Sequence, residues 1–501
     1  MRAVPRTLPQ IDKIVVLMVE NRSLDNVLGW LHPPGSNVTV LPAGSLPNHF
    51  DGIPPDAANE ANGVWYRPRR GFAHLGQQRW RAPRWDPHEG IADVHVQLYG
   101  GSILDSFGGH WPPAAPMAGF AEDFPAGRAD GVGEVMGAYT ADELPVLYGL
   151  ARQFAVSDRW FASMPTETDP NRAFALCGTA EGDEYEVPAR TFGAPTMFEA
   201  LNPSADGVRA GRSWGIYWRS EGRQGFAPAG ECYTVGRFTG VQRALEAPNS
   251  SGRVAPYTDL LDALAAGDDI PDFCWVEPAW GWGWGLPDGG DFVGLQGTDY
   301  HPPTWVGPAE WALDELYRAL RGSRHWSSML FVVLFDEHGG TYDHVGPPLA
   351  TNPDGCTTTL PVPFDYRLFG PRVPAIVVSP FVAPGTVFRP PVGSAAPFDH
   401  TSLIKTVLAW ADADPRQVAA LGERVAAAPV FDWVLASTLR QPAAPLGFDP
   451  PAAFRDQCPL GYRLPFDGYG LTRDHHQMAA TGATTLGEYL AALAQLVEPR
   501  P

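Results

Sequence analysis

The 501-residue chain carries 36 Lys and Arg against 56 Asp and Glu, which gives a formal net charge of −20. Proteins that grip nucleic acid present a basic patch or stripe to the phosphates; the chain has no continuous Lys/Arg run, so nucleic acid and a polybasic membrane anchor are both disfavoured. The composition, 44% hydrophobic and 18% charged, suits a globular protein with an ample core, and no apolar run reaches the roughly 18 residues of an integral membrane segment.

Three short apolar runs in the chain are typical of buried strands in a parallel sheet covered on both faces. They are Ile11–Val19, Met329–Phe335 and Val373–Ser379. Helical patterns alternate with them, at Leu144–Gln153, Glu310–Arg321 and Ser402–Trp410. The alternation predicts an α/β fold with a mostly parallel central sheet flanked by helices.

We expect residues 1–420 to form one α/β domain with long loop-rich insertions near 30–130 and 203–300 that cover a site. Residues 421–501 are predicted to be a C-terminal subregion packed on the same domain, ending in a helix near Leu486–Val497. The five cysteines include no CxxC pair, which disfavours structural zinc and leaves a single disulfide open. The first residues lack the apolar segment of a signal peptide, which predicts a cytoplasmic location, or a periplasmic or secreted one if a signal was trimmed.

Two acidic pairs, Glu20-Asn21 and Asp336-Glu337, follow the first two predicted strands directly. Polar residues just past strand ends are where α/β folds build their sites. A single such pair is more often a cap or an ion-pair partner, but two at strand ends favour a shared metal, because oxygen donors suit hard or borderline divalent cations. An acidic protein also needs a local positive charge at any phosphate site, most simply a metal.

A threonine-rich loop, Met164–Arg172 (MPTETDPNR), follows the predicted strand Phe154–Ser157. Pro170 suits the first turn of a helix. A hydroxyl at a helix start lies beside unpaired N–H groups and the positive end of the helix dipole, which favours phosphate binding, and a metal-activated threonine can attack phosphorus there. Taken alone, Thr166 or Thr168 is better explained as an ordinary N-cap.

Five stretches in a fixed order make the interpretation more specific: Ile11–Gly29, Leu144–Arg172, His301-Pro302-Pro303, Phe331–Pro348 and Val373–Thr406. Together they resemble the phosphoesterase family of bacterial phospholipase C and acid phosphatase AcpA, in the alkaline phosphatase-like superfamily. The resemblance implies an alkaline phosphatase-like core, hydrolysis of phosphoric esters and one divalent metal ion of unknown identity. It implies as metal ligands Glu20, Asn21, Thr168, Asp336 and Glu337.

The resemblance also implies catalytic roles. Thr168 matches the nucleophile that forms a phospho-enzyme intermediate, with Thr166 as the fallback. Asn171 is similar to a residue that contacts phosphate oxygens, and His301 to a histidine that binds phosphate or protonates the leaving group. His88 matches less well because its spacing differs by one residue. A further family histidine expected in residues 203–300 has no evident counterpart.

For several other side chains, two interpretations stay open. The histidines of the matching motifs, His338, His344 and His400, are expected in the site or in structural roles beside it. Trp280–Trp284 (WGWGW) forms either an aromatic wall for a choline-like cation or a packed loop.

The expected partner is a small phosphoester or a phospholipid headgroup. A phosphodiesterase of phospholipase C type is the first prediction. An acid phosphatase or phosphotransferase acting on a small intracellular phosphoester is the alternative, and a non-catalytic metal- or ligand-binding member of the family is the third. The sequence gives no indication of oligomeric state.

Overall fold

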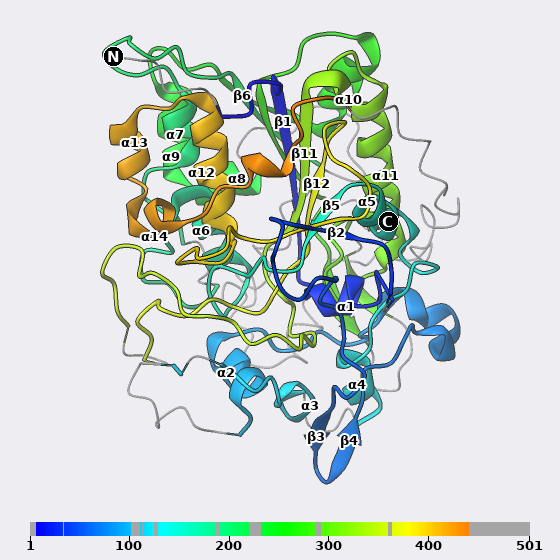
Figure 1. The fold of residues 1–501 in the computed structure, drawn as a ribbon. Helices are drawn as coiled ribbons and strands as arrows, with labels where there is room; N and C mark the ends of the chain where they lie inside the picture. The colour runs from blue at the N-terminus through cyan, green and yellow to red at the C-terminus, as the bar shows by residue number, and fades with distance from the viewer. Residues whose placement is uncertain are drawn as a thin grey trace, which may run out of the picture.

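A nine-stranded sheet forms the centre of the molecule, in the order β2-β13-β5-β12-β11-β1-β8-β6-β7 (Figure 1). The computed structural model describes residues 7–33, 35–101, 111–112, 114–124, 129–186, 190–219, 232–285, 292–295, 297–358 and 363–439. The sheet strands are β1 (Lys13–Val19), β2 (Thr39–Leu41), β5 (Ala155–Ser157), β6 (Trp214–Trp218), β7 (Gly252–Pro256), β8 (Phe273–Glu277), β11 (Met329–Phe335), β12 (Ala375–Val378) and β13 (Thr386–Phe388).

The sheet is mostly parallel, as predicted. β1 pairs in parallel with β11 from Lys13 opposite Met329 to Val19 opposite Phe335, and with β8 on its other side. β12 is the exception among the described strands of this sheet, since it runs antiparallel to both of its neighbours, β11 and β5. Parallel neighbours need a crossover, usually a helix. The described residues between β11 and β12 contain no helix, so the chain returns in the opposite direction.

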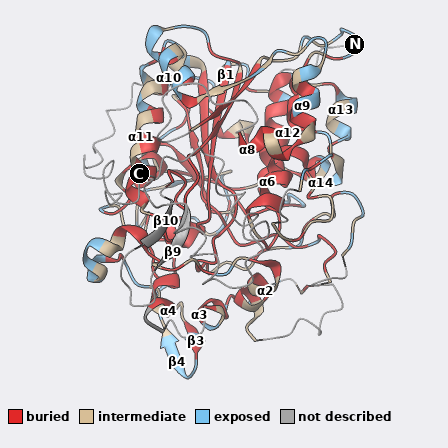
Figure 2. Ribbon diagram, turned by 180° about the vertical axis from the view of Figure 1, so that it is seen from behind, coloured by how far each residue is buried: buried red, intermediate tan, exposed pale blue. Residues whose placement is uncertain are grey.

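Helices cover both faces of the sheet (Figure 1). One group lies on one face: α6 (Thr168–Cys177), α7 (Met197–Leu201), α8 (Tyr233–Arg237), α9 (Thr239–Glu246), α12 (His400–Ala411), α13 (Pro415–Ala419) and α14 (Gly422–Ala427). The opposite face carries α5 (Pro145–Gln153), α10 (Tyr257–Ala266) and α11 (Val306–Gly322). Every residue of β1 and β11 is buried, which agrees with the unbroken apolar runs of these strands. Figure 2 shows the buried residues gathered along the sheet and the inward sides of these helices.

The carboxyl ends of β1 and β11 are covered by residues that precede β5 (Figures 1 and 2). This cover contains α1 (Leu24–Leu28), the hairpin of β3 (Asn59–Ala61) and β4 (Val64–Tyr66), and the helices α2 (Ile91–Tyr99), α3 (Phe120–Asp123) and α4 (Ala129–Val135). These elements overlap the expected insertion near 30–130, whose bounds stay a prediction.

The expected insertion at 203–300 is corrected in part. It supplies three strands of the central sheet, β6, β7 and β8, as well as the small pair β9 (Trp282–Gly285) and β10 (Phe292–Leu295). The rest of the predicted division into domains stays a prediction, and the helix expected near Leu486–Val497 lies outside the described residues.

Two further features bear on the expectations. The four described cysteines, Cys177, Cys232, Cys274 and Cys356, are free thiols. None of the described helices combines the length and apolar character needed to cross a bilayer.

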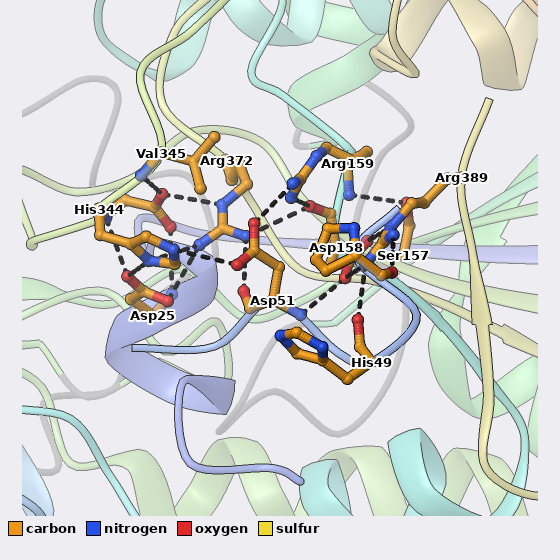
Figure 3. Close-up of polar contacts among 12 residues, drawn as sticks. Asp25, His49, Asp51, Ser157, Asp158, Arg159, His344, Val345, Arg372 and Arg389 are labelled. Atoms are coloured by element: carbon orange, nitrogen blue, oxygen red, sulfur yellow. Dashed lines mark hydrogen bonds and ion pairs between the residues drawn. The ribbon is translucent and has the colours of Figure 1, made fainter. Parts of the chain in front are cut away.

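A buried charge network braces the sheet beside the carboxyl end of β11 (Figure 3). Arg372 lies just before β12, and because β12 is antiparallel, its start falls at the edge where its neighbours end. The guanidinium donates through Nη2 to Asp25 Oδ1 at 3.0 Å and through Nε to Asp343 Oδ1 at 2.8 Å. His344 Nδ1 lies 2.6 Å from the other oxygen of Asp25. α1, β12 and the segment after β11 are thereby tied together.

Replacing the central cation of this network is expected to destabilise the protein. Arg372→Met leaves Asp25 and Asp343, both fully buried, without their shared partner, which typically costs about 3–5 kcal/mol. Urea unfolding followed by circular dichroism measures the change. Arg416→Met, at an arginine whose side chain is 73% exposed, is the control and should leave the midpoint near that of the unaltered protein. Equal midpoints for both variants would contradict the bracing role.

Candidate active site

The two predicted acidic pairs meet at the carboxyl ends of β1 and β11. Since Val19 pairs with Phe335, the next residues on each strand are neighbours. The Asn21 amide N–H donates to Asp336 Oδ1 at 3.2 Å, and the Asp336 N–H donates to the Val19 carbonyl at 3.2 Å. Glu20, Asn21, Asp336 and Glu337 are all buried, with at most 4% of the residue exposed. The structure therefore brings all four together.

Thr168 belongs to the same group, but it is carried by α6 and not by the end of a strand. It is the first residue of α6, and its hydroxyl donates to Asn21 Oδ1 at 3.1 Å. The N-cap position belongs to Glu167, whose side chain makes no capping hydrogen bond. Thr168 is thus no ordinary N-cap. Asn21 adopts a left-handed backbone conformation (φ 52°), which asparagine tolerates better than most residues.

Thr166 and Asn171 hold the loop that carries Thr168. The Thr166 hydroxyl donates to the Glu184 carbonyl at 2.5 Å and is turned to a different partner from that of Thr168. The Asn171 amide nitrogen donates to three loop carbonyls, the shortest at 2.8 Å to Thr166, and its oxygen accepts from the Met164 N–H at 3.0 Å. Asn171 therefore fastens the loop onto α6, and its expected contact with phosphate stays a prediction.

Arg172, one helical turn beyond Thr168, brings positive charge to the acidic group. Its Nε donates to Asp336 Oδ2 at 2.8 Å, and its Nη2 lies 3.9 Å from Glu20 Oε1. The guanidinium packs over the ring of Trp280 at 4.3 Å, which favours the packed-loop interpretation for that tryptophan. The side chains of Trp282 and Trp284 lie outside the described residues.

Burial makes the carboxyl groups of this cluster harder to deprotonate. Burial raises the pKa of Glu337 to about 8 and that of Asp336 to about 6. Burial and the neighbouring charge of Asp336 hold the pKa of Glu20 well above its usual range. Glu337 Oε1 is buried and has no hydrogen-bond partner among the described residues. An uncompensated cluster of this kind favours a cation.

Three further acids in the site were missed from the sequence. Glu89 accepts from Asn21 Nδ2 with both of its oxygens, at 3.2 and 3.1 Å. Asp299 accepts the His301 N–H at 3.3 Å, and its backbone carbonyl accepts the Glu20 N–H at 2.7 Å. Asp86 and Glu89 also lie with His301 at spacings that suit metal ligands. The sequence gives only one signal for Glu89 and Asp299: each lies within two residues of a histidine matched by the resemblance, His88 or His301.

The two candidate catalytic histidines lie in different surroundings. His301 is buried next to the site; its Nδ1 lies 2.5 Å from the Pro302 carbonyl and 4.0 Å from Asp86 Oδ1. A ring nitrogen that faces a carbonyl carries the proton, so Nδ1 of His301 is its protonated nitrogen. The His88 side chain is 45% exposed, 3.8 Å from both Asp93 and Asp123. A hydrogen bond to Asp123 raises its pKa.

The histidines of the matching motifs differ in their contacts, and His338 reaches the acidic group itself, with Nδ1 3.1 Å from Glu337 Oε2. His400 Nε2 lies 2.5 Å from the Asp336 carbonyl, and burial lowers the pKa of His400 to about 4. His338 Nε2 lies 2.6 Å from Gln97 Oε1, and burial lowers its pKa to about 3. His344 belongs to the network around Arg372.

Fold and site together define an α/β enzyme whose site combines buried oxygen donors with a hydroxyl at a helix start, an arrangement suited to phosphate chemistry. The chain belongs to the Phosphoesterase family, whose model matches residues 11–410. The resemblance drawn from the five stretches is confirmed, and the protein is a phosphoric ester hydrolase.

Curated relatives carry phospholipase C names. The chain is 30% identical to "Non-specific phospholipase C4" of Arabidopsis thaliana over 405 residues, which covers 79% of this chain and 67% of the relative. It is 27% identical to "Phospholipase C A" of Mycobacterium tuberculosis over 429 residues, 81% of this chain and 74% of the relative. Among solved structures, a protein in the alkaline phosphatase superfamily from Vibrio parahaemolyticus is 13% identical with a TM-score of 0.32, over 57% of this chain and 64% of that one.

The raised carboxylate pKa values predict how stability depends on pH when cations are removed. Because Asp336 and Glu337 hold protons in the folded state that the unfolded chain releases, the free energy of unfolding falls as pH rises from about 4.5 to about 8. Thermal unfolding in chelator at pH 5, 6, 7 and 8 measures this fall. Glu337→Gln removes the group with the highest of these values and should flatten the change between pH 6 and 8. An equal slope in that variant would show that Glu337 does not titrate there.

Proposed function

We propose that this phosphoric ester hydrolase is a metal-dependent enzyme of phospholipase C type that uses Thr168 as its nucleophile. The observation that carries the proposal is the 3.1 Å contact of the Thr168 hydroxyl with Asn21, at the start of α6 and beside the buried acidic group. The N–H groups of the first helical turn receive no side-chain cap from Glu167, which favours an anion at this position.

The donor chemistry of the acidic group supports one divalent cation. Glu20, Asn21, Asp336 and Glu337 would hold it together with the Thr168 hydroxyl. All are oxygen donors, and the unpartnered Glu337 Oε1 together with the raised carboxylate pKa values supports a cation among them. When bound, the cation would supply positive charge that favours the deprotonated hydroxyl and the charge on the phosphoryl oxygens.

The steps of the reaction are then assigned to individual residues of the chain. Thr168 gives up its hydroxyl proton to solvent and its Oγ attacks phosphorus; the Oγ–P bond forms as the bond from phosphorus to the leaving oxygen breaks, which gives a phospho-threonine. His301 acts as the doubly protonated imidazolium: its Nδ1–H stays with the Pro302 carbonyl, and its Nε2 gives a proton to the leaving oxygen. Arg172 and the start of α6 offset negative charge on the phosphoryl oxygens. Water then attacks phosphorus and gives a proton to His301 Nε2; the Oγ–P bond breaks, and Thr168 Oγ takes up a proton from solvent.

Two isosteric substitutions test the nucleophile. Thr168→Val removes the attacking hydroxyl and should lower kcat by roughly 1,000-fold or more. Thr166→Val is the matched control, since its hydroxyl only donates to the Glu184 carbonyl. It should cost about 1 kcal/mol of stability and leave kcat within about tenfold. Steady-state kinetics on a chromogenic phosphoester measure both. Normal turnover by Thr168→Val would refute the mechanism.

The substrate and the metal are tested with a small panel. The phospholipase C names of the relatives support a phosphodiester, so p-nitrophenylphosphorylcholine should be hydrolysed faster than p-nitrophenyl phosphate. Prolonged dialysis against chelator should abolish hydrolysis, and one divalent cation per chain should restore it. Preference for the monoester would instead assign an acid phosphatase. Full activity after dialysis would contradict the metal requirement.

A further inference from the structure

The β3–β4 hairpin presents apolar side chains to solvent at its tip. The turn residues Asn62 and Gly63 both have positive φ (53° and 78°), as the tight turns of two-residue hairpins require. The residues that follow, Val64 and Trp65, are 50% and 68% exposed. Large side chains at this level of exposure are uncommon in the protein; most of its tryptophans pack in the core. An exposed aromatic tip of this kind marks an interaction surface.

The base of the hairpin is held firmly. Asn59 is 1% exposed, and its Nδ2 donates to the Met117 carbonyl at 2.9 Å. Its Oδ1 accepts from the Ala121 N–H of α3 at 3.4 Å. The tip is therefore carried on a rigid stem, and in both views it projects from the side of the molecule where β1 and β11 end (Figures 1 and 2).

Positive charge continues directly from the apolar tip. Residues 61–85 contain six arginines and no acidic residue, in a chain whose net charge is −20. Arg67, Arg69 and Arg70 are exposed, and none of them forms an ion pair with a described residue. The nearest acid on the hairpin, Glu60, accepts the Gly63 N–H at 2.5 Å. Arg67 follows Trp65 by two residues, and Arg69 and Arg70 lie beyond the end of β4, where their backbone pairs with Ala138.

We propose that the hairpin tip and this arginine cluster form a surface that docks on anionic phospholipid bilayers. Trp65 and Val64 enter the interface between headgroups and acyl chains, where tryptophan is favoured. Arg67, Arg69 and Arg70 meet the anionic headgroups at the same level. The choice of a lipid surface as occupant rests on the proposed phospholipase C function, whereas the apolar and basic patch is independent of it. Docking there places the site-bearing side of the molecule toward its substrate.

Vesicle co-sedimentation of the full chain tests the surface. With vesicles of phosphatidylcholine and 30% phosphatidylglycerol, the unaltered protein should bind, and binding should weaken as salt rises from 0.1 to 0.5 M. Arg67→Gln with Arg69→Gln and Arg70→Gln should weaken partitioning about 100-fold, at about fivefold for each arginine. Val64→Ser with Trp65→Ser should weaken it by roughly tenfold or more.

Matched controls separate the surface from general charge and folding. Arg209→Gln with Arg324→Gln and Arg416→Gln changes the net charge by the same three units at positions after α7, after α11 and on α13, and should leave binding unchanged. Val208, 80% exposed, gives the control Val208→Ser for the apolar arm. Absence of binding by the unaltered protein, or equal binding by the tip and control variants, would overturn the proposal.

Hydrolysis of soluble p-nitrophenylphosphorylcholine distinguishes this inference from the proposed function. The tip variants should keep the kcat and KM of the unaltered protein on this monomeric substrate and lose rate only on phospholipid vesicles. If the unaltered protein bound vesicles but did not hydrolyse the soluble ester, the docking surface would stand and the proposed function would fail. Loss of soluble-ester activity in the tip variants would assign the hairpin to the site itself and overturn the docking role.

Discussion

The burial of several carboxylates at the ends of β1 and β11 is the constraint on which the rest of the structure depends. Glu20, Asp336 and Glu337 are withdrawn from water by the pairing of two fully buried strands. Isolated carboxylates in such a place cost several kcal/mol each. Arg172 offsets part of this cost, and the raised pKa values show that it does not offset all of it. The carboxyl edge of the sheet is therefore built to receive further positive charge.

The single antiparallel strand has an electrostatic consequence. Because β12 runs against its neighbours, the residue before it, Arg372, falls at the carboxyl edge instead of the opposite one. There it forms ion pairs with both Asp25 and Asp343, and His344, whose pKa is raised to about 9, adds a second positive charge beside Asp25. The group around Arg372 therefore holds two cationic side chains, whereas Arg172 is the arginine paired with the acidic group that contains Asp336 and Glu20.

The sequence predicted the parts of the fold that depend on local pattern. The bounds of β11 agree with its apolar run, and the meeting of Glu20-Asn21 with Asp336-Glu337 follows from parallel strands ending together. It did not predict β6 and β7, because Trp214–Trp218 and Gly252–Pro256 are only five residues long, each contains a glycine, and the second also contains an arginine and a proline. Residue pattern alone did not separate Thr168 from Thr166, and only the family resemblance selected Thr168, because the partners of the two hydroxyls, Asn21 and Glu184, lie outside the loop. Glu89 was hidden beside His88 for a similar reason: adjacent side chains in a loop face different surroundings.

The segment that covers the carboxyl edge runs from the exposed β3–β4 hairpin to the acidic group of the site. From Asn59 the chain forms the hairpin, crosses the arginine cluster and reaches Glu89, whose carboxylate holds the amide of Asn21. Asn21 in turn accepts the Thr168 hydroxyl. Between the tip and Thr168, the proposed nucleophile, lie one continuous stretch of chain and two side-chain hydrogen bonds. Loops tolerate sequence change because they carry few packing constraints, but this one is fixed at both ends, by the contact of Asn59 with α3 and by the contact of Glu89 with Asn21. The proposed docking of the tip on a lipid surface would therefore hold the acidic group at a set orientation to that surface, which a cover without these contacts could not do.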